Sequence, residues 1–298
     1  MERAAFRTLA VWLGSLCFVC LLADPRVRAD STVKFKLIQN HWVVLPILVN
    51  GKGPFDFLLD TGANVTMMTP ELAKQLTIRP IARVSLVTVA GSQIVPYSLL
   101  PGLSLGPQTV ENIEVIYSDL SEMRSLNPHI CGVLGQNFLS QFNYTLNYQD
   151  RLIEFGEGQH KNHPLGSRLQ FEQREGRLII AAQPTSSKKK VLKLVLDSGV
   201  SRLIIFETTS RSLELDLEQS MNRWVTGSTA AGSRQMRAAY LRTLQIGSAR
   251  FSKLPVALVE APGAEDRFGD GLLPTSLFRS IFFNNKEGYV LLNERASQ

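Results

Sequence analysis

Short runs of hydrophobic residues alternate with polar positions along most of the chain, and turn-forming residues separate them. Residues 32–49 carry apolar side chains on both sides of an interruption at 39–41, which predicts a β-hairpin. Asn50-Gly51 is a strong turn signal, and a strand over residues 55–59 follows it. Another hairpin is predicted over residues 82–98. Short strands in such an order are typical of an all-β fold.

Helix signals are few along the chain. Thr69 and Pro70 are residue types favoured at an N-cap and at the first helical position, so a short helix is predicted from Pro70 through Leu76. Residues 136–142 indicate a helix of one or two turns. Residues 206–215 are the counterpart of the first helix in the second half of the chain. The fold is therefore predicted to contain mostly strands and few helices.

The second half of the chain repeats the first in order, which is the strongest feature of the sequence. Leu-Ser-Leu-Gly at 103–106 recurs as Leu-Gln-Ile-Gly at 244–247, an offset of 141 residues (244 − 103). Gly-Val-Leu at 132–134 recurs as Gly-Leu-Leu at 271–273, an offset of 139 residues (271 − 132). Several matches at similar offsets indicate one internal duplication, and hence two related β lobes.

The duplication sets the predicted domain boundaries. The N-terminal lobe covers residues 30–155 and the C-terminal lobe covers residues 168–298. Residues 156–167 show no apolar period and contain Gly, His and Pro, so they are interpreted as the linker between the lobes. We therefore expect an all-β, bilobal protein of the β-barrel type, with a few short helices, that is a monomer with an internal pseudo-twofold axis.

Each predicted lobe carries the same kind of polar triplet directly after an apolar strand. Asp60-Thr61-Gly62 follows the apolar residues 57–59, and Asp197-Ser198-Gly199 follows the apolar residues 194–196, an offset of 137 residues (197 − 60). Glycine permits a sharp, close-packed turn just after each Asp. Either triplet alone would be interpreted as a surface β-turn. Two copies in matched contexts instead predict a pair of carboxylates between the lobes.

Two neighbouring carboxyl groups cannot both ionise at low cost, so such a pair holds one proton across the acidic to neutral range. The ionised Asp can take a proton from water while the protonated Asp polarises a carbonyl, which requires no metal and no covalent intermediate. Asp60 and Asp197 are therefore the predicted catalytic pair, and neither a cofactor nor a metal is predicted. The hydroxyls and backbone N–H groups of the two turns are expected to support the pair: Thr61, Gly62, Ser198 and Gly199.

On these residues the chain resembles the pepsin and retropepsin class of aspartic peptidases. Val133-Leu134-Gly135 and its partner Leu272-Leu273-Pro274 add to the likeness, which covers nearly all of residues 32–293. The resemblance implies two β lobes, with Asp60 and Asp197 facing each other across a cleft. It also implies a polypeptide substrate that binds in the cleft as an extended strand.

A β-hairpin flap over the cleft is a further implication of this resemblance. By position, residues 84–97 form the flap of the first lobe, and the matching hairpin suggests a second flap, as in a fused retropepsin dimer. The substrate-binding tips would be formed by Ala90, Gly91, Ser92, Ala231, Gly232 and Ser233. The sequence departs from the family pattern at Pro274, where Gly is expected, and at Val200, where a small residue is expected.

Two alternatives to an aspartic endopeptidase stay open on the sequence. One is a peptide-binding protein on the same fold that is catalytically weak or inactive, which Pro274 and Val200 motivate. The other is a glycosidase with two carboxylates, whose carboxyl groups would lie about 5 Å or more apart without sharing a proton. Turnover of an unfolded polypeptide distinguishes the first alternative, and the separation of the carboxyl groups distinguishes the second.

The composition is that of an ordinary globular protein, with 44% hydrophobic residues, 19% charged residues and a formal net charge of +6. The basic run at 187–190 has no interleaved aromatic residues, so it is interpreted as an exposed hairpin end, and no nucleic-acid partner is predicted. His160 and His163 fall in the predicted linker, which favours a solvated loop over a metal site. Cys131 has apolar neighbours and is predicted to be a buried small hydrophobe.

Residues 1–29 have the pattern of an N-terminal signal peptide. Arg3 and Arg7 precede an apolar stretch at 9–23 that is short for a membrane span, and Val27-Arg28-Ala29 resembles a small-residue cleavage site. We therefore expect an exported protein, periplasmic or secreted, which contacts a membrane only if this segment is not cleaved. Cleavage would leave Cys131 as the single thiol, so no internal disulfide is expected.

Overall fold

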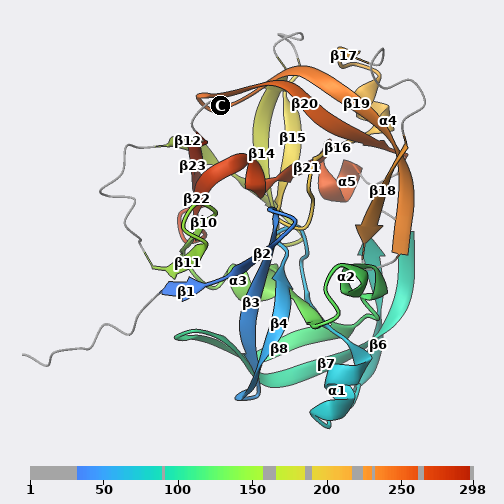
Figure 1. The fold of residues 1–298 in the computed structure, drawn as a ribbon, viewed down its shortest axis with the longest axis vertical. Coiled ribbons are helices and arrows are strands. Elements are labelled where there is room, and N and C mark those ends of the chain that lie inside the picture. The colour runs from blue at the N-terminus through green and yellow to red at the C-terminus, as the bar shows by residue number, and fades with distance from the viewer. Residues whose placement is uncertain are drawn as a thin grey trace, which may run out of the picture.

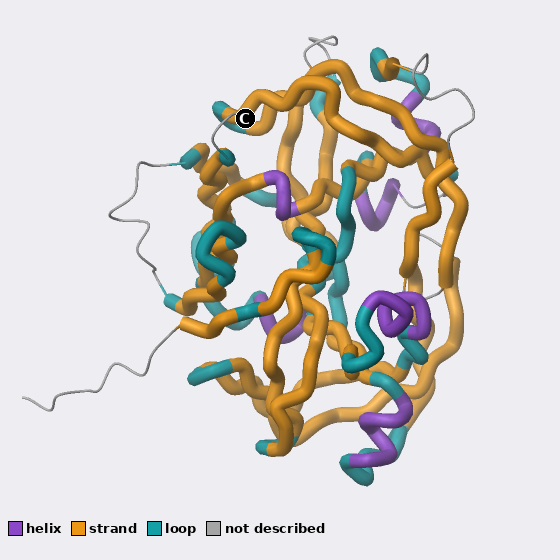
Figure 2. Tube along the Cα trace, in the orientation of Figure 1, coloured by secondary structure: helices purple, strands orange, loops and turns teal. Residues whose placement is uncertain are grey.

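Two lobes, one above the other in Figure 1, contain most of the strands of this protein, and a further group of strands lies at their side. The computed structural model describes residues 32–88, 91–156, 166–184, 190–216, 224–229, 232–260 and 265–295. Strands predominate, and the few helices are short (Figure 2). The architecture is therefore all-β and bilobal, as the repeated pattern predicted.

Some sequence predictions fall outside the described residues. They concern the signal peptide at 1–29, residues 157–165 of the linker with both of its histidines, residues 187–189 of the basic run, and the flap residues Ala90 and Ala231. These features, and the exact lobe boundaries, stay predictions. None of the helices in the described ranges is long and apolar enough to span a bilayer.

The first lobe is an eight-stranded sheet with the order β2-β3-β4-β9-β5-β8-β7-β6. Because β3 also pairs with β7, the strands from β3 to β7 in this order close into a ring. Two pairs are parallel, β4 with β9 and β5 with β8, and the others are antiparallel. The strands are β2 (Lys36–Ile38), β3 (Trp42–Val49), β4 (Lys52–Leu59), β5 (Thr66–Met68), β6 (Ala82–Thr88), β7 (Gly91–Leu105), β8 (Gln108–Tyr117) and β9 (Ile130–Leu134).

The second lobe repeats this ring with the order β14-β15-β21-β16-β20-β19, and β14 also pairs with β19. Again two pairs are parallel, β15 with β21 and β16 with β20. Hence β14 corresponds to β3, β15 to β4 and β21 to β9. The strands are β13 (Glu172–Arg174), β14 (Arg177–Pro184), β15 (Leu192–Asp197), β16 (Leu203–Phe206), β17 (Leu215–Asp216), β18 (Trp224–Thr229), β19 (Gly232–Ile246), β20 (Ala249–Val259) and β21 (Gly271–Pro274).

A third sheet joins the two halves, with the order β1-β11-β10-β22-β23-β12. At the seam β10 pairs with β22, and the rings of Tyr144 and Phe283 stack with their centroids 4.6 Å apart. The largest hydrophobic cluster includes Leu59, Leu196 and Ile281, so one core spans both lobes and the shared sheet. The strands are β1 (Thr32–Lys34), β10 (Tyr144–Asn147), β11 (Leu152–Phe155), β12 (Ser167–Gln170), β22 (Phe278–Asn284) and β23 (Tyr289–Glu294).

The helices are α1 (Pro70–Gln75), α2 (Ser121–Leu126), α3 (Gln136–Leu139), α4 (Glu207–Ser210) and α5 (Glu265–Phe268), with a 3₁₀ turn η2 (Thr275–Leu277). The prediction for α1 is confirmed, because the Thr69 side chain accepts a hydrogen bond from the Leu72 N–H (3.3 Å). The predicted helix at 206–215 is wrong in length, since it ends after one turn. Hydroxyls of Ser210 and Ser212 bond to carbonyls three residues back, which competes with helix continuation.

Two smaller predictions also differ from the structure. The helix predicted at 136–142 ends at Leu139, because the chain turns there to enter the shared sheet at Tyr144. Cys131 is half-buried rather than buried, and its thiol donates a hydrogen bond to the His129 carbonyl (3.3 Å). Partial burial raises the pKa of Cys131, so this thiol is protonated and a poor nucleophile at neutral pH.

Candidate active site

The two Asp-containing turns leave the lobes at equivalent places. β4 ends at Leu59 just before Asp60, and β15 ends at Asp197. Each delivering strand is buried against its lobe core and pairs in parallel with the strand of the second glycine motif, β9 or β21. A buried strand fixes the position of the residue at its end. The same local sequence pattern therefore produces the same turn twice, facing the boundary between the lobes.

Four hydrogen bonds tie these turns to each other across that boundary. The Thr61 hydroxyl donates to the Leu196 carbonyl (2.8 Å) and accepts from the Ser198 N–H (3.0 Å). In return, the Ser198 hydroxyl donates to the Leu59 carbonyl (2.8 Å) and accepts from the Thr61 N–H (3.0 Å). Both side chains are buried. The hydroxyls predicted to lock the turns are thus placed to do so in a reciprocal pattern.

The two carboxyl groups lie side by side and hydrogen-bond to each other. Asp60 Oδ1 accepts hydrogen bonds from the N–H groups of Gly62 (2.9 Å) and Ala63 (3.1 Å), whereas Asp197 Oδ1 accepts one from the Gly199 N–H (2.7 Å). Two donors stabilise a carboxylate more than one donor does. The two side chains therefore have similar geometry, but the hydrogen-bond donors around Asp60 stabilise a negative charge more than those around Asp197.

Burial is the main influence on the ionisation of this pair. Loss of hydration raises the pKa of Asp60, and the N–H donors of Gly62 and Ala63 oppose that rise. Burial, followed by repulsion from the Asp60 charge, raises the pKa of Asp197 well above its usual range. Because one ionised carboxylate disfavours the second, the pair retains one proton as the pH rises from acidic toward neutral.

The glycines of both turns are required for close approach. A Cβ atom on Gly62 would overlap the Asp197 carboxylate, and one on Gly199 would lie 2.9 Å from Asp60 Oδ2. Gly135 serves a different contact, since a Cβ there would lie 2.7 Å from the Val65 carbonyl carbon and oxygen. Its counterpart Pro274 is buried in β21, opposite Asp197 in the parallel register.

Three residues that the sequence did not assign to the site hold these turns. Gln136 is buried, and its Nε2 donates to the Thr61 carbonyl (2.9 Å). Trp42 Nε1 donates to the Gly199 carbonyl (3.0 Å), and Arg177 Nε donates to the Gly62 carbonyl (3.0 Å). The one signal that could have found the last two is their placement, because each is the first residue of the strand preceding an Asp strand.

Two hairpins occur at the predicted flap positions. In the first lobe β6 pairs with β7, with Thr88 opposite Gly91 and Val87 opposite Ser92. In the second lobe β18 pairs with β19, with Thr229 opposite Gly232 and Ser228 opposite Ser233. The α2 helix of the first lobe contacts both β18 and β19. Whether these hairpins act as flaps stays a prediction.

A small, mostly apolar pocket adjoins the carboxyl pair. Its lining includes Asp60, Gly199 and the apolar side chains of Trp42, Leu58, Leu59, Met123, Leu126 and Val133. Val200 does not line it. This side chain packs instead against the apolar cluster around Ile179 and Val195 in the second lobe. Within the described ranges no cluster of His, Cys, Asp and Glu side chains could hold a metal ion.

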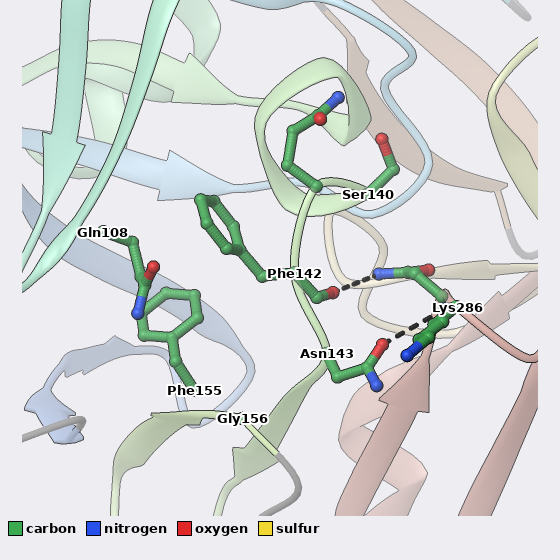
Figure 3. A pocket seen from close by; sticks show the side chains of 9 residues that line it. Gln108, Ser140, Phe142, Asn143, Phe155, Gly156 and Lys286 are labelled. Carbon is green, nitrogen blue, oxygen red and sulfur yellow. Dashed lines mark hydrogen bonds between the residues drawn. The ribbon is translucent and has the colours of Figure 1, made fainter.

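A second pocket lies beside the shared sheet, and no residue of either Asp turn lines it (Figure 3). Phe142, Asn143, Phe155 and Lys286 contribute to its wall. Polar groups of its lining residues already form internal hydrogen bonds. Asn285 Nδ2 donates to the Phe142 carbonyl (2.6 Å), and the Lys286 N–H donates to Asn143 Oδ1 (3.1 Å). No residue of the carboxyl pair lines this pocket, so it is a separate feature.

Comparison with known families gives the same division into halves. A family model described as "Aspartyl protease" matches residues 45–138 and 184–277, one segment in each lobe. Each segment contains one Asp turn and one second glycine motif or its Pro274 variant, and together they span more than half of the chain. No curated protein matches the chain. With both lobes matched and both Asp turns at the lobe boundary, the chain belongs to the aspartyl protease family.

Proposed function

We propose that this protein is an aspartic endopeptidase that hydrolyses peptide bonds with water activated between Asp60 and Asp197. The observation that carries the proposal is the hydrogen bond between two carboxyl groups, Asp197 buried and Asp60 half-buried, which reciprocal bonds across the lobe boundary hold in place. Family membership supports a protease-type function. The pairing disfavours the glycosidase alternative, since glycosidase carboxyl groups stand about 5 Å or more apart.

The proposed reaction uses the single shared proton. The ionised carboxylate removes a proton from water while the water oxygen attacks the scissile carbonyl carbon, and the other carboxyl gives its proton to the carbonyl oxygen. The resulting tetrahedral species carries two hydroxyls, and its C–N bond then breaks. The protonated carboxyl gives its proton to the leaving amine nitrogen, while the other carboxylate takes a proton from one of the hydroxyls. The pair ends with one proton, as it began. Burial favours this cycle because it keeps the pair singly protonated near neutral pH.

We further propose that the substrate is a polypeptide bound as an extended strand beneath the two hairpins. The apolar side chains that line the small pocket beside Asp60 offer a surface for contact with that strand. Ile94 on the first hairpin and Trp224 on the second are large apolar side chains that stand exposed, which suits contacts with a peptide. The pattern of residues 1–29 supports export to the periplasm or the exterior.

Cleavage of an unfolded polypeptide between pH 3 and pH 7, by the chain lacking residues 1–29, tests this function. We expect turnover by the wild type, inhibition by a statine-type peptide, and loss of at least about a thousandfold in Asp60→Asn and in Asp197→Asn. Asp150→Asn, which changes a carboxylate in the β10–β11 turn, is the control and should keep full activity. An inactive wild type that still binds the statine peptide would favour the peptide-binding alternative instead.

A further inference from the structure

Each lobe reaches across the boundary to the Asp turn of the other lobe. Trp42 begins β3 and donates to the Gly199 carbonyl, whereas Arg177 begins β14 and donates to the Gly62 carbonyl, both at 3.0 Å. Since β3 and β14 occupy equivalent places in the two rings, these contacts are related by the pseudo-twofold axis. One is made by a neutral indole and the other by a cation. The same hydrogen bond is therefore present on both sides of the boundary, but its donor is neutral in one lobe and positively charged in the other.

Arg177 occupies an unusual place for a cation, because its side chain is only 4% exposed. Its Nη1 lies 3.3 Å from Glu175 Oε2, and its guanidinium carbon lies 4.4 Å from the centre of the Phe268 ring. Glu175 also pairs with Arg267 (3.6 Å), so one carboxylate serves two arginines. The positive charge of Arg177 is thus only partly balanced by its own neighbours, and it acts on Asp60 and Asp197.

A single peptide unit connects Arg177 to Asp60. The Gly62 carbonyl that accepts the Arg177 Nε–H belongs to the same peptide group as the Ala63 N–H, which donates to Asp60 Oδ1 (3.1 Å). A charged donor on the carbonyl polarises that group and strengthens the hydrogen bond made by its N–H. On the other side, Trp42 places only a neutral donor on the Gly199 carbonyl.

From this geometry we infer that Arg177 is a positioning residue that fixes the negative charge of the pair on Asp60, leaves the shared proton on Asp197, and moves the working pH range downward. The inference rests on the proposed function, in which this singly protonated pair is the reactive form. Arg177 itself touches neither the water nor the substrate in this scheme. Its influence passes through the Gly62–Ala63 peptide group and through its charge.

The other ionisable groups around the pair do not replace this charge. The hydroxyl of Tyr148, in the turn after β10, bonds to the Thr275 hydroxyl (2.6 Å). Burial raises the pKa of Tyr148, so it is neutral in the working range. His41 lies beside Trp42, with ring centroids 4.3 Å apart. Burial lowers the pKa of His41, and the positive charge of Arg202 helps to lower it, so this ring is neutral near pH 7.

The test compares Arg177→Met with Arg177→Lys and with the matched variant Trp42→Phe, which removes the equivalent hydrogen bond without removing a charge. We expect both limbs of the pH profile of kcat/KM to move to higher pH in Arg177→Met, because the cation no longer favours ionised carboxylates. Arg177→Lys should return the profile toward that of the wild type. Trp42→Phe should change the rate at most, and leave both limbs in place.

An activity-independent readout separates this inference from the proposed function. Carbon-13 NMR of labelled Asp carboxyls, assigned with Asp60→Asn and Asp197→Asn, follows each carboxyl against pH without any substrate. We expect the Asp60 signal to titrate at higher pH in Arg177→Met than in the wild type. Unmoved signals and an unmoved profile in folded Arg177→Met would overturn the inference. Moved signals in a protein without turnover would uphold it and reject the endopeptidase.

Discussion

Replacing Thr61 with valine tests whether the reciprocal bonds across the lobe boundary hold the site together. Valine has nearly the shape of threonine, so the substitution removes the hydroxyl with little change in volume. Two buried groups lose their partner: the Leu196 carbonyl, which accepts from the Thr61 hydroxyl, and the Ser198 N–H, which donates to it. All three residues are at most 1% exposed, so water cannot replace the lost partner.

The expected cost follows from counting these orphaned groups. Leaving a buried polar group without a hydrogen bond costs about 1–3 kcal/mol. Two such groups predict that Thr61→Val lowers the free energy of unfolding by about 2–6 kcal/mol. Natural domains of this kind have a total stability of about 5–15 kcal/mol. The single hydroxyl is therefore predicted to account for a large share of the stability of the whole protein.

Urea unfolding followed by far-UV circular dichroism measures this change, with equal slopes required for a direct comparison of free energies. Thr61→Ser keeps both bonds and loses one buried methyl group, which costs about 1 kcal/mol. Thr109→Val is the surface control, because the Thr109 hydroxyl bonds to the Ser104 hydroxyl (2.9 Å) and Thr109 is exposed. That change should stay within about 0.5 kcal/mol. A Thr61→Val protein as stable as Thr109→Val would refute the reasoning.

Two further outcomes test the ionisation and the packing of the site. Burial raises the pKa of Asp197 above its unfolded value, so the native protein loses stability as the pH rises from about 4 through the folded pKa. We therefore expect Asp197→Asn to have a higher melting temperature than the wild type at pH 7. This difference should vanish near pH 3. Gly135→Ala places a Cβ 2.7 Å from the Val65 backbone and should cost about 1–3 kcal/mol in urea unfolding, whereas Gly102→Ala, whose Cβ has no neighbour closer than 3.8 Å, should stay within about 0.5 kcal/mol.

The fold could be predicted from the sequence because the signals for its strands and turns are local, and the internal repeat presents them twice. Apolar strands ended by Asn50-Gly51 or by an Asp turn define where each strand stops, and the repeat at 103–106 and 244–247 aligns the two rings. The Asp turns were found for the same reason. Helix lengths were predicted less well, since the hydroxyls around Ser210 stop α4 through bonds that propensity alone does not reveal.

The contacts that set the chemistry of the site could not be predicted in this way. Trp42 and Gly199 are 157 residues apart, and Arg177 and Gly62 are 115 residues apart. Neither Trp42 nor Arg177 belongs to a motif, and an Arg at the start of a strand is ordinarily solvent-exposed. The same holds for Gln136, whose role depends on a carbonyl 75 residues away. Such pairs become visible only when the lobes are placed against each other.

Duplication within one chain allows the two carboxyl groups to have different surroundings, which two identical subunits do not allow. Identical subunits must surround both carboxyl groups with the same side chains, so the free pair is equivalent by symmetry. Here the rings are matched, yet the Asp60 turn is held by Gln136 and Arg177, while Trp42 holds the Asp197 turn. In the proposed reaction, this inequality would assign the base to Asp60 and the acid to Asp197 before any substrate binds. We expect Asp60→Asn and Asp197→Asn to differ for this reason, with the first losing the favoured site of negative charge and the second the favoured site of the proton.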